Sequence, residues 1–150
     1  MAKKNTGGFT AEERSAMKER AAELKREEKR AKAVDKAAAA QAEVRAKISN
    51  MPDGDRQMAE HLHEIVTRTA PHLSPKVYYG QPAYARDGKV VVFFRSGQMD
   101  KERYSTFGVT QQAPLDNECG FWATSYALAD PSNDAWEHVG TIIEEAAGQV

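Results

Sequence analysis

The stretch from Lys76 to Arg95 constrains the fold most, because it combines strand-forming residues with a tight-turn signal. Asp87-Gly88 suits a two-residue turn, since Asp tolerates the left-handed backbone region and Gly adopts it without steric cost. Val, Tyr and Phe, which favour strands, lie on both sides of this pair. We therefore predict a β-hairpin with arms Pro82–Arg86 and Lys89–Arg95. Five consecutive apolar residues in the second arm indicate a central or doubly covered strand.

An N-terminal arm precedes this region. Residues 1–8 are polar and are predicted to be disordered, whereas residues 9–50 are predicted to form a charged helical arm. Thr10 and Glu13 have the spacing of a capping box at the start of this helix. Large apolar residues are too sparse for a coiled coil, which needs them in several consecutive heptads. Three interpretations of the arm stay open: a solvated helix, a partner-binding helix and a nucleic-acid arm.

The charge of the chain disfavours nucleic acid as its partner. The net charge is -1, with 13 Lys+Arg against 8 Asp+Glu in residues 1–50 and 8 against 14 in residues 51–150. The basic residues of the arm alternate with acidic ones, which repel phosphates. Cys119 is the only cysteine, and no run of about 20 apolar residues could cross a bilayer. We therefore expect a cytoplasmic protein without a disulfide and without a membrane partner.

Residues 51–150 are predicted to form one compact domain after a break at Ser49–Gly54. A helix is expected from about Arg56 to Ala70, with Asp53 or Asp55 as its N-cap. The hairpin follows this helix, and further strands are expected downstream at Glu102–Val109 and Phe121–Leu128.

A last helix is predicted to begin around Asp130–Asn133. Its buried stripe would consist of four residues at helical spacing: Trp136, Val139, Ile143 and Ala147. The predicted elements do not alternate between strand and helix, so a parallel sheet is not expected. The sequence predicts an α+β fold in which an antiparallel sheet packs against two helices on one face, preceded by the helical arm.

The hairpin region also carries a family resemblance. The run Lys76-x-x-Tyr79-Gly80-x-Pro82-Ala83-Tyr84, continued by Gly88-Lys89-Val90 and Phe93-Phe94, resembles the YdhG-like family of small bacterial domains over about residues 51–147. The resemblance implies a frataxin-like fold. One branch of the family implies an intracellular iron chaperone that passes ferrous iron to an iron–sulfur assembly partner. No catalytic motif comes with the resemblance, and we expect a protein that is not an enzyme.

Four residues of the first domain helix form the candidate metal site: Glu60, His61, His63 and Glu64. Residues three apart are neighbours on a helix, and carboxylate and imidazole groups suit ferrous iron, zinc or copper. Asp53 and Asp55 would widen this site into a weak surface ridge for iron. The alternative is a solvated helix face with histidines at its margins.

A second candidate site consists of aromatic residues, namely Tyr79, Tyr84, Phe94 and Trp122. These side chains would line a ligand pocket, or they would pack in the core with hydroxyl groups at its rim. Two functions follow for the chain. The first is a weak, surface-bound iron carrier, and the alternative is a metal-free module that binds a protein or small ligand through the Tyr-Gly-x-Pro-Ala-Tyr hairpin and the arm.

Overall fold

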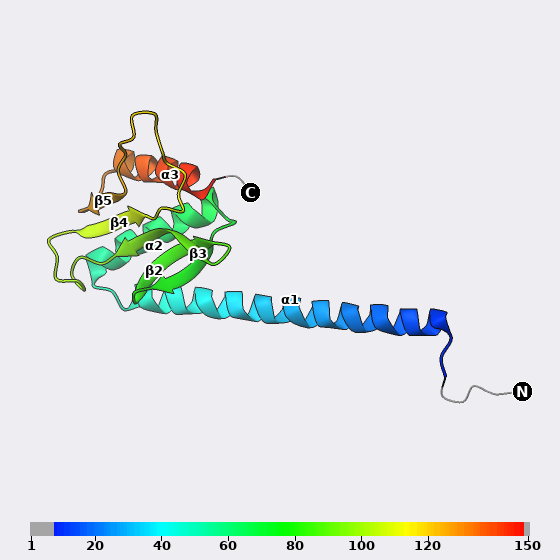
Figure 1. Ribbon diagram of the computed structural model, residues 1–150. Helices are drawn as coiled ribbons and strands as arrows, with labels where there is room; N and C mark the ends of the chain where they lie inside the picture. Colours follow the sequence, from blue (N-terminus) through cyan, green and yellow to red (C-terminus); the bar gives the residue numbers. More distant parts are fainter. Residues whose placement is uncertain (1–7, 149–150) are drawn as a thin grey trace, which may run out of the picture. The chain divides into compact units, whose positions relative to one another are not determined.

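The computed structural model describes residues 8–148 and has the predicted α+β fold (Figure 1). Five strands form one antiparallel sheet in the order β1-β2-β3-β4-β5. The prediction of disorder for residues 1–8 falls outside the described residues, except for Gly8. The elements, in chain order, are α1 (Ala11–Ser49), α2 (Asp53–Thr69), β1 (Ser74–Tyr78), β2 (Gln81–Arg86), β3 (Lys89–Arg95), β4 (Ser105–Val109), β5 (Ser125–Leu128) and α3 (Asn133–Ala147).

The chain divides into two compact units between Lys36 and Ala37. The prediction placed this boundary at Met51. The first unit contains the N-terminal part of α1, whose residues are almost all exposed. The second unit begins within α1, because Val44 and Ile48 are buried in its core. The last turns of α1 are therefore part of the compact unit.

The predicted capping box at the start of α1 is confirmed. Thr10 Oγ1 accepts a hydrogen bond from the backbone N–H of Glu13 at 3.0 Å, and the Thr10 N–H donates to Glu13 Oε1 at 3.3 Å. These two bonds satisfy amide groups that have no partner within the helix.

Two turns of the same type connect the first three strands. Asp87 and Gly88 have φ angles of 51° and 81°, which confirms the predicted hairpin between β2 and β3. Tyr79 and Gly80, with φ angles of 48° and 77°, form an equivalent two-residue turn between β1 and β2. Positive φ at both central residues defines the type I′ turn, whose twist matches that of paired strands.

A β-bulge explains why consecutive residues of β3 are buried on the same side. Tyr84 pairs with Val92 and Ala85 with Val90, so Val91 is an extra residue in β3. A bulge of this kind turns two successive side chains towards one face of the sheet. Val91 and Val92 are both fully buried.

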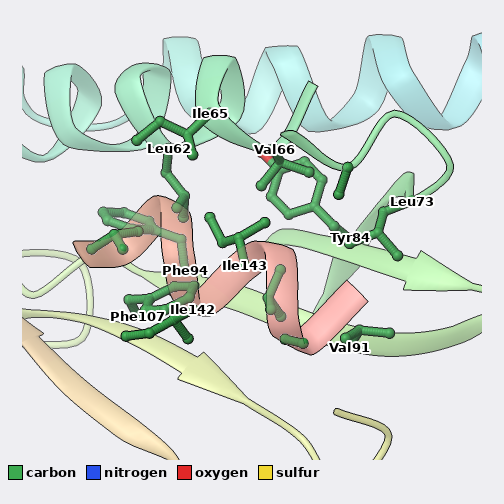
Figure 2. Packing of buried hydrophobic residues seen from close by; sticks show 14 of the residues in the cluster. Leu62, Ile65, Val66, Leu73, Tyr84, Val91, Phe94, Phe107, Ile142 and Ile143 are labelled. Atoms are coloured by element: carbon green, nitrogen blue, oxygen red, sulfur yellow. The ribbon is translucent and has the colours of Figure 1, made fainter. Parts of the chain in front are cut away.

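The core lies between one face of the sheet and the helices (Figure 2). Leu62 and Val66 of α2 and Ile143 of α3 point towards the aromatic side chains of the sheet. Tyr84, Phe94 and Phe107 are the largest of the fully buried side chains. We call the face that carries them the covered face. The predicted stripe of α3, Trp136, Val139, Ile143 and Ala147, is buried as expected.

Two predicted strands are shorter in the structure. β4 begins at Ser105 rather than Glu102, and β5 begins at Ser125 rather than Phe121. Phe121 and Trp122 are exposed. The alternation of large and small residues from Phe121 to Leu128 therefore predicted a longer strand than the one that pairs with β4.

Candidate binding surface

The four predicted metal-site residues do not converge in the structure. The His61 ring stacks on Trp136 of α3 with ring centroids 4.2 Å apart, whereas His63 Nδ1 lies 2.8 Å from the hydroxyl group of Tyr84. Glu60 Oε1 instead lies 3.4 Å from Nε of Arg56. His61 and His63 are two positions apart, so buried Leu62 separates them around the helix. Residues 8–148 contain no group of three or more His, Cys, Asp or Glu side chains placed to hold a metal ion.

His63 is half-buried, and its hydrogen bond joins it to Tyr84 of the core. Burial lowers the pKa of His63, and the charge of Arg45 lowers it further against the opposing effect of Glu64. Burial raises the pKa of the Tyr84 phenol well above its ordinary value. Both side chains are therefore neutral at pH 7 and share one hydrogen bond near the end of α1.

The four predicted ligand-site residues are also separated. Tyr84 and Phe94 belong to the core, whereas Tyr79 is 79% exposed and Trp122 is 39% exposed. The alternative prediction, core packing, therefore describes Tyr84 and Phe94. Side chains alternate between the two faces along a strand, and Tyr79 lies in a turn, so closeness in sequence does not bring these residues together.

An aromatic patch lies on the opposite face of the sheet and consists of Tyr78, Tyr79 and Phe93. The ring centroids of Tyr78 and Tyr79 are 4.5 Å apart, and those of Tyr78 and Phe93 are 5.6 Å apart. Tyr78 and Phe93 are half-buried, and Tyr79 is largely exposed. We call this side of the sheet the open face because these three rings remain at least partly accessible there, although the small side chains of Ala83 and Ala85 between the strands are buried.

Gly108 of β4 positions the ring of Phe93. A Cβ atom at Gly108 would lie 2.2 Å from Cζ of Phe93, far inside van der Waals contact. Phe93 is paired with Gly108 across the two strands, and its ring lies over that glycine. The absence of a side chain at Gly108 therefore allows the Phe93 ring to lie flat against the sheet.

Arg95 holds the turn that carries Tyr79. Its Nη1 donates a hydrogen bond of 2.8 Å to the carbonyl oxygen of Tyr79. Its Nε and Nη2 donate to the two carboxylate oxygens of Asp100, each at 3.0 Å. Gln81 Nε2 also donates to Asp100, at 3.0 Å. The position of Tyr79 is thus fixed from the end of β3.

A buried polar network connects Gln81, which bonds to Asp100, with the start of α2. The backbone N–H of Ser96 donates to Oε1 of Gln81, and Ser96 Oγ donates to Asp55 Oδ2 at 2.5 Å. The N–H of Gln98 donates to the same carboxylate oxygen at 3.0 Å. The capping role predicted for Asp53 or Asp55 is wrong, because Pro52 is the N-cap and no side chain in the described part of the chain caps α2. Asp55 instead connects α2 to the loop after β3.

The hydrogen bonds to Asp55 determine its ionisation. Burial by itself would raise the pKa of this carboxyl, but hydrogen bonds from Ser96, Gln98 and Ser105 outweigh burial and lower it. Asp55 therefore remains a carboxylate at neutral pH, although its side chain is buried.

The turn at Asp87-Gly88 was predicted from the sequence, but the equivalent two-residue turn at Tyr79-Gly80 and the role of Arg95 were not. The Tyr79-Gly80 pair was a usable signal for the second turn, because Gly often follows a residue of positive φ in a two-residue hairpin. Nothing in the local sequence indicates that Arg95 reaches back 16 residues to Tyr79.

Comparison with protein-family models, with curated proteins and with solved structures finds no match for this chain. Its class therefore follows from the structure alone: an α+β protein with one helix-covered sheet face and one open face. None of the helices within residues 8–148 combines the length and apolar character that a membrane span requires.

Proposed function

We propose that this protein is a binding module that captures a protein partner with the aromatic patch on its open sheet face. The observation that carries the proposal is the conformation of Tyr79. This bulky residue has a φ angle of 48° and is 79% exposed, so it is both strained and accessible.

Strain at Tyr79 supports a functional role. A residue with a Cβ atom in the left-handed region costs about 1–2 kcal/mol, and Asn, Asp or Gly is preferred in such turns. The equivalent position of the second turn is occupied by Asp87. Strained backbone conformations concentrate at functional sites, where the surrounding structure holds them. Arg95 and Asp100 provide that support here.

The composition of the patch favours a protein partner. Tyr and Arg are enriched among the interface residues that contribute most binding energy. Tyr78 contacts the ring of Tyr79 and is itself supported by the ring of Phe93, which reduces the freedom of Tyr79 before a partner binds and lowers the entropic cost of association.

Photo-crosslinking tests this function in the full-length chain. A benzoyl-phenylalanine residue is placed at position 79, and the matched control places it at position 87 in the other type I′ turn. We expect a discrete crosslinked partner from position 79 that is absent with position 87. The same adducts from both positions, or none from position 79, would contradict the proposal.

Iron carriage is the second candidate, because the YdhG-like resemblance implies it. Glu60 and Glu64 favour it, since both are exposed and lie one helical turn apart on α2. Ferrous iron is then a cargo held weakly by carboxylates, for delivery to an assembly partner. Calorimetric titration with ferrous iron should show binding that is lost when Glu60→Gln and Glu64→Lys are combined. The control changes Glu19→Gln and Glu23→Lys on α1, an exposed pair with the same spacing. Equal loss in both variants would exclude a site on α2.

A further inference from the structure

Among the described residues 8–148, β5 forms one edge of the sheet and pairs with β4 alone. The backbone N–H of Val109 donates to the carbonyl oxygen of Thr124 at 2.8 Å, next to the pair Gly108–Ser125. Directly opposite residues in an antiparallel ladder alternate between bonded and non-bonded pairs. The N–H and C=O groups of Ser125 and Ala127 therefore point away from β4, towards the free edge.

The two edges of the sheet differ in how they resist a further strand. β1 contains Pro75 and Lys76, and proline and lysine are common devices that block pairing at an edge. β5 contains neither, and its Ser125 and Ala127 are exposed. Tyr126 stacks on Phe107 and Leu128 is buried, so β5 is anchored from the covered face while its outer edge stays accessible.

The segment around β5 is also uncharged and carries exposed aromatic rings. No Asp, Glu, Lys, Arg or His lies between Glu118 and Asp130. Immediately before β5, Phe121 is 83% exposed and Trp122 is 39% exposed. An uncharged edge with neighbouring aromatic side chains has the hydrogen-bonding groups and the apolar surface that strand addition requires.

We propose that β5 pairs antiparallel with β5 of a second copy of this chain, which extends the sheet across a two-fold axis. A two-fold contact places the same surface of both copies face to face, so any charge there would meet its own counterpart. The uncharged run from Cys119 to Ala129 removes that repulsion. The outward groups of Ser125 and Ala127 then bond to the same strand of the second copy, and Phe121 and Trp122 of each copy lose exposure.

This contact is small, because it consists of one short strand and two aromatic side chains from each copy. Interfaces below about 1,200 Å² are typical of weak or transient association. The proposed dimer therefore forms reversibly, and its population increases with protein concentration. The proposal concerns the β5 edge and is independent of the aromatic patch on the open face.

Sedimentation velocity of the full-length chain tests the proposal. The experiment covers about 10 µM to about 1 mM, the range expected for a weak interface. It is run with a reductant, since exposed Cys119 could otherwise crosslink two copies. We expect the mass to rise from 16.6 kDa towards twice that value. A mass that stays monomeric throughout would overturn the proposal. The same result is expected if the β5 edge binds a different protein, so that alternative would also overturn it.

Matched lysine variants locate the contact. Ala127→Lys places like charges across the proposed axis and should raise the dissociation constant at least about tenfold. Ser74→Lys makes the same kind of change at an exposed position of the β1 edge and should leave the mass unchanged. Dimerisation that tolerates Ala127→Lys, for example through α1, would overturn the proposal.

Amide hydrogen exchange provides a readout that does not depend on a variant. In the unmodified chain, the N–H groups of Ser125 and Ala127 should become protected as concentration increases, since they bond only in the dimer. The N–H groups of β1 should not change. Protection that rises at β1 but not at β5 would show that a different surface associates.

Discussion

Both faces of the sheet carry Tyr and Phe side chains, but these side chains differ in burial between the two faces. On the covered face, Tyr84, Phe94 and Phe107 are fully buried against the helices. On the open face, Tyr78 and Phe93 are half-buried and Tyr79 is exposed. An aromatic side chain therefore stabilises the fold on one face and remains at least partly accessible on the other.

Neighbouring residues of β3 show this difference most directly. Phe94 is 0% exposed in the core, whereas the Phe93 ring lies over Gly108 on the open face. We expect Phe94→Ala to reduce the free energy of unfolding by about 3–5 kcal/mol, because it leaves a cavity. Phe93→Ala should cost about 1 kcal/mol, since less of its surface is buried. Urea denaturation measures both values. Equal losses would mean that the open face is a second core.

Disrupting the hydrogen bonds of Asp55 should give the next largest loss in the free energy of unfolding, because these bonds hold α2 on the covered face. Asp55→Asn places an amide donor against the donors Ser96 and Gln98, which should reduce the free energy of unfolding by about 2 kcal/mol. Asp53→Asn is the matched control, since the Asp53 side chain is 86% exposed and should matter little. Chemical denaturation of both variants tests the difference, and an equal effect would remove Asp55 from this role.

The same residue predicts a pH dependence. The pKa of Asp55 is lower in the folded chain than in the unfolded chain. Its contribution to stability is therefore present above the unfolded pKa and is lost as the pH falls through the folded pKa. The acid-induced loss of stability should be smaller in Asp55→Asn than in the unmodified chain. Denaturation curves at a series of acidic pH values measure it, and parallel pH profiles would contradict the prediction.

On the open face, replacing Tyr79 should stabilise the fold. Tyr79→Asn puts a residue that tolerates positive φ into the type I′ turn, so we expect a gain of about 1 kcal/mol in the free energy of unfolding. Asp87→Asn makes the matched change where the residue is already suitable and should alter stability by less than about 0.5 kcal/mol. Thermal and urea unfolding measure both. A loss of stability in Tyr79→Asn would show that Tyr79 supports the fold instead of a binding surface.

The smallest effect on the free energy of unfolding should come from the ionisation of His63, at the edge of the covered face. Its pKa is lowered by burial and by Arg45, so the folded chain binds this proton less readily than the unfolded chain. Stability from the neutral ring is present above about pH 6.5 and is lost as the pH falls through the folded pKa. Arg45→Gln should raise the pKa of His63 in an NMR titration. No change in that pKa would exclude the contribution of Arg45.

Elements whose signals are local could be predicted from the amino-acid sequence alone. The Asp87-Gly88 turn, the capping box at Thr10 and Glu13 and the apolar stripe of α3 all depend on residues that are close along the chain. The order of these elements was then sufficient to predict an antiparallel sheet with two helices.

Which side chains contact one another depends on how the chain packs and could not be predicted from the sequence. Asp55 bonds to Ser96 across 41 residues and Arg95 reaches Tyr79 across 16, so no local pattern predicts either contact. The bulge at Val91 also changes which residues of β3 face the core. His61 and His63 lie together in sequence but are held by different partners, Trp136 and Tyr84. Local backbone preferences depend on neighbouring residues, whereas a binding surface depends on distances that exist only after the chain has packed.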